Sequence, residues 1–476
     1  MNVFQRQIIK GSAANFLGIG LGVVNNIWIF PLAFTLEELG IYRWVERTAV
    51  LIAAIALLGL HRTYVRYQSR FEGARGGLFL SNILALALAS TALCGLAFTF
   101  FAQALAQALG ASGSAAELQF LGAVVAGSMT YTLGLSIASS AKRISIPFFL
   151  KNVGIRSALL IGAYAVSRGF SSFGEWMRLL AFAQLGVGLV VLVYAVRLKG
   201  LPLVRPRALG EGLGKELATF ASSGIVMAMM TMGLATIDSQ MIAGMLSYEA
   251  LGVYSIAFFI GSFVDGIRRP VSQALSPQFA TLWNDGAIDQ IATTYARTSR
   301  VLMAVALLAL VAIVPNVDDL FLLIPSGARF DAAKPVVVLI LISRVIDYSF
   351  GSNGEILSNG PYFKWNLFAI SGLVAVLIGL NYLLLPIFGL RGAGFALIIA
   401  YTVFNLVKAR FLYLKEGIQP FGRAQFQLLL FALATLGAAL LVDHGVDGSF
   451  WWRIALKNAT IALGVALGFL ALRKKI

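Results

Sequence analysis

The sequence predicts an all-α polytopic membrane protein with about 14 transmembrane helices. Hydrophobic residues make up 59% of its 476 residues, charged residues only 12%, and the mean hydropathy is +0.84. An ordinary soluble domain carries roughly 25% charged residues, so no soluble core accounts for this apolar excess. Stretches of about 20 apolar residues, the length that crosses the hydrocarbon of a bilayer, recur along nearly the whole chain.

These stretches define the expected helices in chain order. The first is too long for the apolar region of a signal peptide and lacks a clear cleavage site, so we interpret it as a retained span. The predicted spans are 8–34, 38–60, 78–101, 118–141, 144–167, 176–197, 217–241, 249–270, 298–315, 332–352, 364–386, 391–413, 424–443 and 451–472.

The distribution of basic residues predicts the orientation in the membrane. With the N-terminus inside, 25 of the 37 Lys and Arg residues fall in cytoplasmic connections and nine fall on the opposite side. This asymmetry predicts a bacterial inner-membrane protein with both termini in the cytoplasm. It also explains the net charge of +16 without a nucleic-acid partner, because basic loops face anionic membrane lipids.

Several kinds of chemistry are disfavoured by the sequence. Cys94 is the single cysteine, and His61 and His444 are far apart in the chain, so neither a disulfide nor a metal-ligand spacing exists. The adjacent pair Asp318 and Asp319 is a weak candidate for a metal motif. Phosphate-loop, nucleophile-elbow and paired-histidine motifs are absent, and no cofactor is expected.

Loop lengths argue against a membrane-embedded polymerase, ligase or glycosyltransferase. No predicted external loop exceeds about 20 residues, and the longest internal connections, 197–216 and 271–297, are scarcely longer. Such enzymes usually need a large loop or domain to hold a sugar substrate, and this chain leaves no room for one. The sequence therefore favours a transporter over an enzyme.

An internal repeat indicates two related halves. Residues 37–42 read EELGIY and residues 249–254 read EALGVY, at an offset of 212, and each segment follows the first span of its half. Repeated halves are common in transporters. The repeat predicts an N-terminal lobe of six helices (1–200), a cytoplasmic linker (201–216), a second six-helix lobe (217–415) and two accessory helices (424–476).

One segment connects this layout to a known family. Residues 380–396 read LNYLLLPIFGLRGAGFA, in which an Asn and a Pro end one helix and a Gly-rich turn opens the next. This segment resembles the corresponding junction in prokaryotic polysaccharide and O-antigen flippases of the multidrug, oligosaccharidyl-lipid and polysaccharide exporter superfamily. The matching positions are Asn381, Pro386, Gly389, Gly392, Ala393 and Ala396, with further likeness at Asn359, Gly360, Lys364, the LGIY segment and RYQSRF at 66–71.

The resemblance implies a water-filled central cavity between two pseudo-symmetric lobes, lined by cations that receive the diphosphate of a lipid-linked glycan. Charged residues inside spans are candidates by default because a charge at mid-bilayer is costly. We therefore expect the cavity cations among a small set of residues, in the order Arg156, Arg344, Lys151, Arg47 and Arg43. The alternative is that Asp347 neutralises Arg344, and that Arg43 and Arg47 are held by Glu46 or snorkel outward.

Two further acidic residues are candidates for coupling transport to H⁺ or Na⁺. Asp238 lies near the outer end of the seventh span and aligns with Asn26 at the repeat offset. Asp265 precedes Arg268 and Arg269 by three and four residues, so an ion pair on its own helix is the expected alternative.

The function expected from this resemblance is alternating-access translocation of an undecaprenyl-diphosphate oligosaccharide, such as an O-antigen or capsule unit. A flippase for lipid II, the peptidoglycan precursor, is the nearest alternative, because a diphosphate is common to both substrates. A cation-coupled multidrug exporter is less favoured, since its cavity should be acidic. The expected partners are the lipid-linked glycan, membrane lipids, and the polysaccharide polymerase and chain-length machinery.

Overall fold

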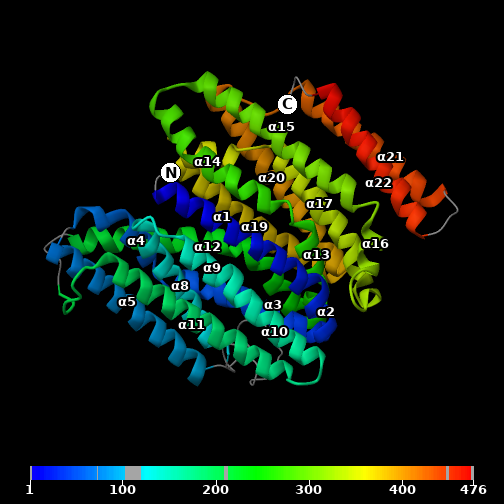
Figure 1. The fold of residues 1–476 in the computed structure, drawn as a ribbon. Coiled ribbons are helices and arrows are strands. Elements are labelled where there is room, and N and C mark those ends of the chain that lie inside the picture. The colour runs from blue at the N-terminus through cyan, green and yellow to red at the C-terminus, as the bar shows by residue number, and fades with distance from the viewer. Residues whose placement is uncertain (1–2, 72, 102–119, 208–212, 446–449, 473–476) are drawn as a thin grey trace. The chain divides into compact units, whose positions relative to one another are not determined.

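The structure is a computed structural model that describes residues 3–71, 73–101, 120–207, 213–445 and 450–472 (Figure 1). All regular elements in these ranges are helices, which confirms the predicted fold class. The helices pack into two compact units, Met1–Gly252 and Val253–Ile476. Helix α12 (Leu213–Met245) follows the predicted linker yet packs against α3 (Leu36–Ala56), within the first unit. The lobe boundaries at 200, 217 and 415 remain predictions.

The first unit contains the helices of the first six predicted spans together with α12. Several spans are interrupted by π-helical or tight segments. In chain order its elements are α1 (Val3–Val23), η1 (Val24–Ile29), α2 (Phe30–Ala33), α3 (Leu36–Ala56), α4 (Leu60–Tyr67), η2 (Gln68–Arg70), α5 (Gly73–Phe100), α8 (Leu121–Ser140), α9 (Ser145–Phe149), η3 (Leu150–Ile155), α10 (Arg156–Ser167), α11 (Phe173–Lys199) and α12.

Local sequence signals explain where these helices begin and bend. Thr35 and Glu38 form a reciprocal capping box that starts α3, and Ser172 with Glu175 does the same for α11. Between α3 and α4 the chain bends by 52°, where Gly59 adopts φ +70°, a left-handed conformation that glycine adopts without steric cost.

The second unit begins within α13 (Tyr248–Gly261) and ends with a helical hairpin. Its remaining elements are α14 (Asp265–Asn284), α15 (Ile288–Ile313), α16 (Val317–Leu322), η4 (Gly327–Ala333), α17 (Lys334–Ser349), α18 (Asn353–Ser358), α19 (Phe363–Phe388), α20 (Leu390–Glu416), α21 (Arg423–Gly445) and α22 (Phe450–Leu472). Helices α21 and α22 lie side by side (red in Figure 1), in the place of the two predicted accessory helices.

The helix inventory supports a multi-pass membrane protein but differs in detail from the prediction. Among the described residues, nine helices are long and apolar enough to span a membrane, or twelve if each bent pair counts as one span. The total of 14 remains a prediction. The expected connection 271–297 is largely helical, because α14 extends to Asn284 through Pro270 and Pro277. The low apolar content of α14 explains why the sequence did not predict a helix there. Likewise, α19 continues past Pro386 to Phe388 and turns only at Gly389.

The two LGxY repeats contact each other reciprocally inside the first unit. A Cβ atom on Gly40 would lie 1.8 Å from Tyr248 O, and one on Gly252 would lie 2.1 Å from Leu36 O. At the repeat offset of 212, Leu36 corresponds to Tyr248 and Gly40 corresponds to Gly252. Each glycine thus opposes the residue four positions before the other glycine, as a two-fold relation between the segments requires. Small residues permit such close helix approach.

We predict that Gly40→Ala and Gly252→Ala each destabilise the protein. The added methyl must displace backbone, not a flexible side chain, so the cost should be about 1–3 kcal/mol. Thermal unfolding of the purified protein in detergent measures the effect. Gly186→Ala on α11 is the matched control, because a Cβ there meets nothing within 4 Å. Equal melting temperatures for Gly40→Ala and Gly186→Ala would contradict the close contact.

A buried ion pair fixes the C-terminal hairpin to the second unit. Lys457 of α22 is 1% exposed, and its Nζ lies 2.5 Å from Asp319 Oδ2 and 2.8 Å from Pro315 O. Arg453 approaches the same carboxylate at 3.7 Å. The neighbouring Asp318 pairs instead with Lys334 at 2.8 Å. The two adjacent acids are therefore engaged in ion pairs of different burial.

Removing one partner of the buried pair should destabilise the protein far more than removing one partner of the exposed pair. Lys457→Met leaves the Asp319 carboxylate buried, at a cost of about 3–5 kcal/mol. Lys334→Met should cost less than about 1 kcal/mol, because Asp318 is 70% exposed. Thermal unfolding tests both, and the double variant Lys457→Met/Asp319→Leu should recover most of the loss. A double variant as unstable as the single one would argue against this pairing.

Candidate functional site

Arg43, Glu46 and Arg47 lie on α3 of the first unit at the helical spacing that places them on one face. Arg43 Nη1 and Glu46 Oε2 are 2.8 Å apart. Arg47 Nη1 donates a hydrogen bond to Ala235 O of α12 at 3.0 Å. The Arg43 side chain is 14% exposed whereas that of Glu46 is 42% exposed, so the carboxylate forms the accessible end of the pair.

Two π-helical segments, η1 in the first span and η3 in the fifth, support this face. Segment η1 packs against α10, and η3 packs against α1. Asn25 of η1 donates from Nδ2 to Arg156 O, where η3 ends, at 3.0 Å. Single π-turns inside α-helices occur frequently at functional sites, because the extra residue redirects side chains and frees carbonyl groups.

Helix α1 and the adjoining segment η1 contact both half-buried arginines. Arg156 Nη1 donates to Gly18 O, and a Cβ on Gly22, one turn later, would lie 2.8 Å from that nitrogen. Asn26 donates to Gly22 O at 2.6 Å and accepts a hydrogen bond from Arg43. The absence of a side chain at Gly22 therefore makes room for the Arg156 guanidinium, which lies close to Asn26.

Lys151 completes a group of cations around one carboxylate. It is exposed on η3, with Nζ 4.5 Å from the centre of the Tyr131 ring. Glu46 interacts electrostatically with all four cations, and within the described residues no other carboxylate acts on Arg43, Lys151 or Arg156. We call these four residues the basic cluster: Arg43, Arg47, Lys151 and Arg156.

The structure thus brings together four of the five predicted cavity cations, with Glu46 beside them. Their contact with a substrate remains a prediction. Asp238 is 6% exposed on α12, one turn beyond Ala235, and its coupling role also remains a prediction. The fifth cation, Arg344, lies in the second unit, in a different electrostatic setting.

In the second unit two ion pairs connect α14 with α17. Arg344 Nε is 3.2 Å from Asp265 Oδ1, and Arg268 pairs with Asp347. This pairing differs from the one expected along each helix, in which Asp347 neutralises Arg344 and Asp265 pairs with Arg268. Each helix carries an acid and a base three residues apart in opposite order, and each base pairs with an acid of the other helix.

Helix α20 extends these pairs into a larger network. Asn405 Nδ2 donates to Asp347 Oδ1 at 2.9 Å, and Lys408, which is 4% exposed, interacts electrostatically with Asp347 and Glu355. We call the resulting six charged residues the paired network: Arg268, Arg344, Lys408, Asp265, Asp347 and Glu355. Its cations and carboxylates are equal in number, so it carries no surplus charge when all are ionised.

Lys408 lies within the predicted span 391–413 but is not among the five predicted cavity cations. The structure places it inside α20, buried among polar groups. A signal was available: Tyr401, Asn405 and Lys408 follow at spacings of four and three, which put them on one helix face.

Comparisons with known proteins identify the fold. No family model matches the sequence, and no curated protein matches it. Among solved structures, the chain is similar to the lipid II flippase MurJ in an inward closed conformation, with TM-score 0.79 and 12% identity over 98% of this chain and 99% of that one.

The chain is also similar to transporters of the MATE family. An inward-facing multidrug resistance MATE transporter of the MOP superfamily gives TM-score 0.66 and 14% identity over 86% of this chain and 98% of that one. MATE in complex with MaL6 gives TM-score 0.57 and 14% identity over 87% and 96%. The chain therefore has the fold shared by these transporters, and at such low identity the roles of its residues rest on its own structure.

We predict that Gly22→Ala and Arg156→Ala act on the same contact. In the wild type, the added methyl displaces the guanidinium and disrupts its hydrogen bond to Gly18 O, at a cost of about 1–2 kcal/mol. In an Arg156→Ala background the same change should cost little, because the clash is gone. Thermal unfolding of the four proteins of this cycle measures the coupling. Gly20→Ala, where a Cβ meets nothing within 4 Å, is the control. Additive effects of Gly22→Ala and Arg156→Ala on stability would exclude the proposed contact between Gly22 and the Arg156 guanidinium.

Proposed function

We propose that this protein is a flippase that moves a lipid-linked oligosaccharide, carried on undecaprenyl diphosphate, from the inner to the outer leaflet of the bacterial cytoplasmic membrane. The observation that carries the proposal is the basic cluster, in which Arg43, Lys151 and Arg156 lie around the carboxylate of Glu46, with Arg47 beside it, on helices of membrane-spanning length. The likeness of the fold to a lipid II flippase and to MATE transporters supports transport, in which no covalent bond is made or broken.

The chemistry of the cluster suits a diphosphate. A diphosphate diester carries about two negative charges at neutral pH, and three cations of the cluster, Arg43, Lys151 and Arg156, share the carboxylate of Glu46. Guanidinium groups pair with phosphate oxygens through two parallel hydrogen bonds, and a lysine ammonium adds a point charge. Arg43 and Arg156 would bind the phosphates from adjacent positions beside η1 and α1, with Lys151 at the exposed edge. The polyprenyl tail would remain in the lipid.

Glu46 would act as the internal competitor of the substrate. Its carboxylate already occupies Arg43, at 2.8 Å, and is the accessible member of that pair. An arriving phosphate would displace it, and its return would restore the ion pair when the substrate leaves. Because the cation is never left without a counter-charge, the competition lowers the barrier to release.

A second candidate is a flippase for lipid II. The specific observation in its favour is the alignment with MurJ over 98% of this chain, compared with 86–87% for the two MATE structures. A drug exporter for cationic compounds is disfavoured by the same cluster, because surplus positive charge repels a cation. Coupling to H⁺ or Na⁺ and association with a polysaccharide polymerase and chain-length machinery belong to the proposal as expectations.

Transport can be measured with a fluorescent undecaprenyl-diphosphate oligosaccharide in proteoliposomes. Arg43→Gln and Arg156→Gln should each slow flipping by about tenfold or more, because each removes a charge-assisted hydrogen bond worth about 1.5–3 kcal/mol. Arg156→Lys should retain part of the rate. Arg178→Gln is the matched control, since this exposed residue of α11 lies outside the basic cluster.

The outcomes separate the candidates. Flipping of the oligosaccharide but not of lipid II, with loss in both arginine variants, supports the proposal, and the reverse preference assigns the protein to lipid II. Export of a cationic dye without movement of either lipid would refute a flippase. Full activity in Arg43→Gln and Arg156→Gln would remove the basic cluster from the mechanism.

A further inference from the structure

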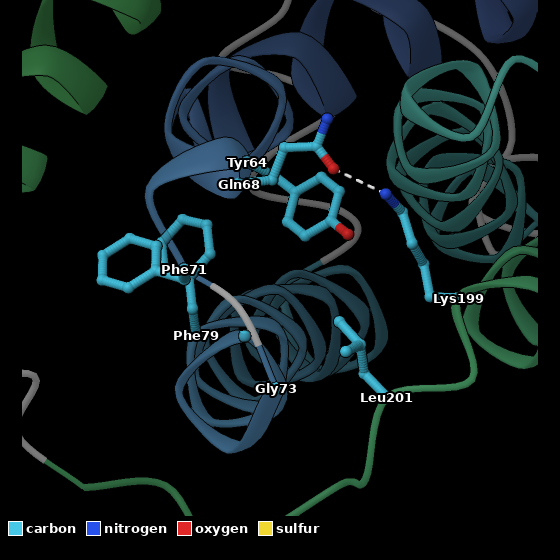
Figure 2. Close-up of a pocket in the computed structure, with 8 residues that line it drawn as sticks. Tyr64, Gln68, Phe71, Gly73, Phe79, Lys199 and Leu201 are labelled. Atoms are coloured by element: carbon cyan, nitrogen blue, oxygen red, sulfur yellow. Dashed lines mark hydrogen bonds between the residues drawn. The ribbon is translucent and has the colours of Figure 1, made fainter.

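A cavity of about 280 Å³ lies in the first unit, at the ends of α4, α5 and α11 (Figure 2). This volume corresponds to about nine water molecules at ~30 Å³ each, which is enough for a phosphate with a small attached group. The lining residues are Tyr64, Gln68, Phe71, Gly73, Gly76, Phe79, Lys199 and Leu201. None of them belongs to the basic cluster.

The cavity combines one cation with an aromatic wall. Figure 2 shows Lys199 reaching Gln68 from one side, with Phe71 and Phe79 on the other. Lys199 Nζ donates to Gln68 Oε1 at 2.5 Å. The rings of Phe71 and Phe79 stack with centroids 4.6 Å apart, and Phe79 stacks on Tyr64 at 5.9 Å. One end of the cavity is therefore polar and cationic, and the other is apolar.

Lys199 retains binding capacity. An ammonium group has three N–H donors, and Gln68 accepts a hydrogen bond from one of them. Within the described part of the chain, Lys199 forms no salt bridge, so its charge is held by a neutral amide. An anion that entered the cavity would find a cation without having to displace a carboxylate from it.

The cavity lies at the end of two helices that are candidates for membrane spans, where lipid headgroups would be expected. Helices α5 and α11 are both long and apolar enough to span a membrane, and the cavity lies where α5 begins and α11 ends. Exposed basic residues flank it: Arg66, Arg75, and Arg70, which pairs with Glu216 at 3.0 Å. In the predicted orientation this end faces the cytoplasm, where the membrane surface is anionic.

We propose that this cavity binds the headgroup of an anionic phospholipid. The phosphate would accept hydrogen bonds from Lys199, the adjoining glycerol and first methylenes would pack against Phe71, Phe79 and Leu201, and the flanking arginines would attract the anionic lipid. The ligand chemistry is that of a phosphate diester with an apolar extension, which a soluble phosphate lacks. The site would tie the ends of three helices to the cytoplasmic leaflet, and it does not depend on the transported substrate.

The test is thermal unfolding of the full chain in detergent, titrated with phosphatidylglycerol, phosphatidylcholine or inorganic phosphate. Phosphatidylglycerol should raise the melting temperature and the other two should not. Lys199→Gln should weaken this effect by at least about tenfold, the equivalent of one charge-assisted hydrogen bond. Arg178→Gln, an exposed cation near the opposite end of the same helix, should leave it unchanged.

A second variant keeps the result interpretable if Lys199→Gln folds poorly. Leu201→Trp fills the cavity without changing any charge and should abolish the phosphatidylglycerol effect. Equal stabilisation by phosphatidylcholine would show non-specific lipid solvation and overturn the proposal. Stabilisation by inorganic phosphate alone would assign the cavity to a free anion, and an unchanged response in both variants would place lipid binding elsewhere.

Discussion

The constraint on which this structure depends is that a charge within apolar helices must meet another charge or a polar group. In the second unit this requirement fixes how helices pair: Asp265 with Arg344 and Arg268 with Asp347 match α14 to α17, and Asn405 adds α20. Leaving one such charge without its partner costs several kcal/mol, so the pairs specify the arrangement even where they add little net stability. Lys457 on Asp319 fixes the C-terminal hairpin in the same way.

The first unit depends on a second constraint, close approach between helices. Gly40 and Gly252 let the two repeat segments contact each other through their backbones, and Gly22 leaves room for the Arg156 side chain. In each case the missing side chain determines what can lie beside it. Glycine thus serves the fold at Gly40 and Gly252 and the basic cluster at Gly22, and helix propensity alone would favour alanine at all three positions.

Composition was enough to predict an all-helical membrane protein, because length and apolarity of a span are properties of the chain alone. Spacing was enough to place Arg43, Glu46 and Arg47 on one face, since three and four residues make one turn. Sequence could not show that Asp265 faces Arg344, because that depends on how α14 and α17 pack. The π-turn at η3, which brings Arg156 to Gly18, was also hidden, as it arises from packing against α1.

The contrast between the two charged groups bears on how a flippase could work. At about 4 Å and an effective dielectric constant near 20, two like charges repel by about 4 kcal/mol, so neighbouring cations such as Arg43 and Arg156 favour water or an anion beside them. The paired network has no such need. A diphosphate would relieve the repulsion between these cations only while it is bound to the basic cluster. A ligand shifts a conformational equilibrium through a difference in interaction free energy between the two states, and this relief would supply such a difference. The paired network, already neutral, would gain nothing from the same anion, so the basic cluster is where substrate binding can drive a conformational change.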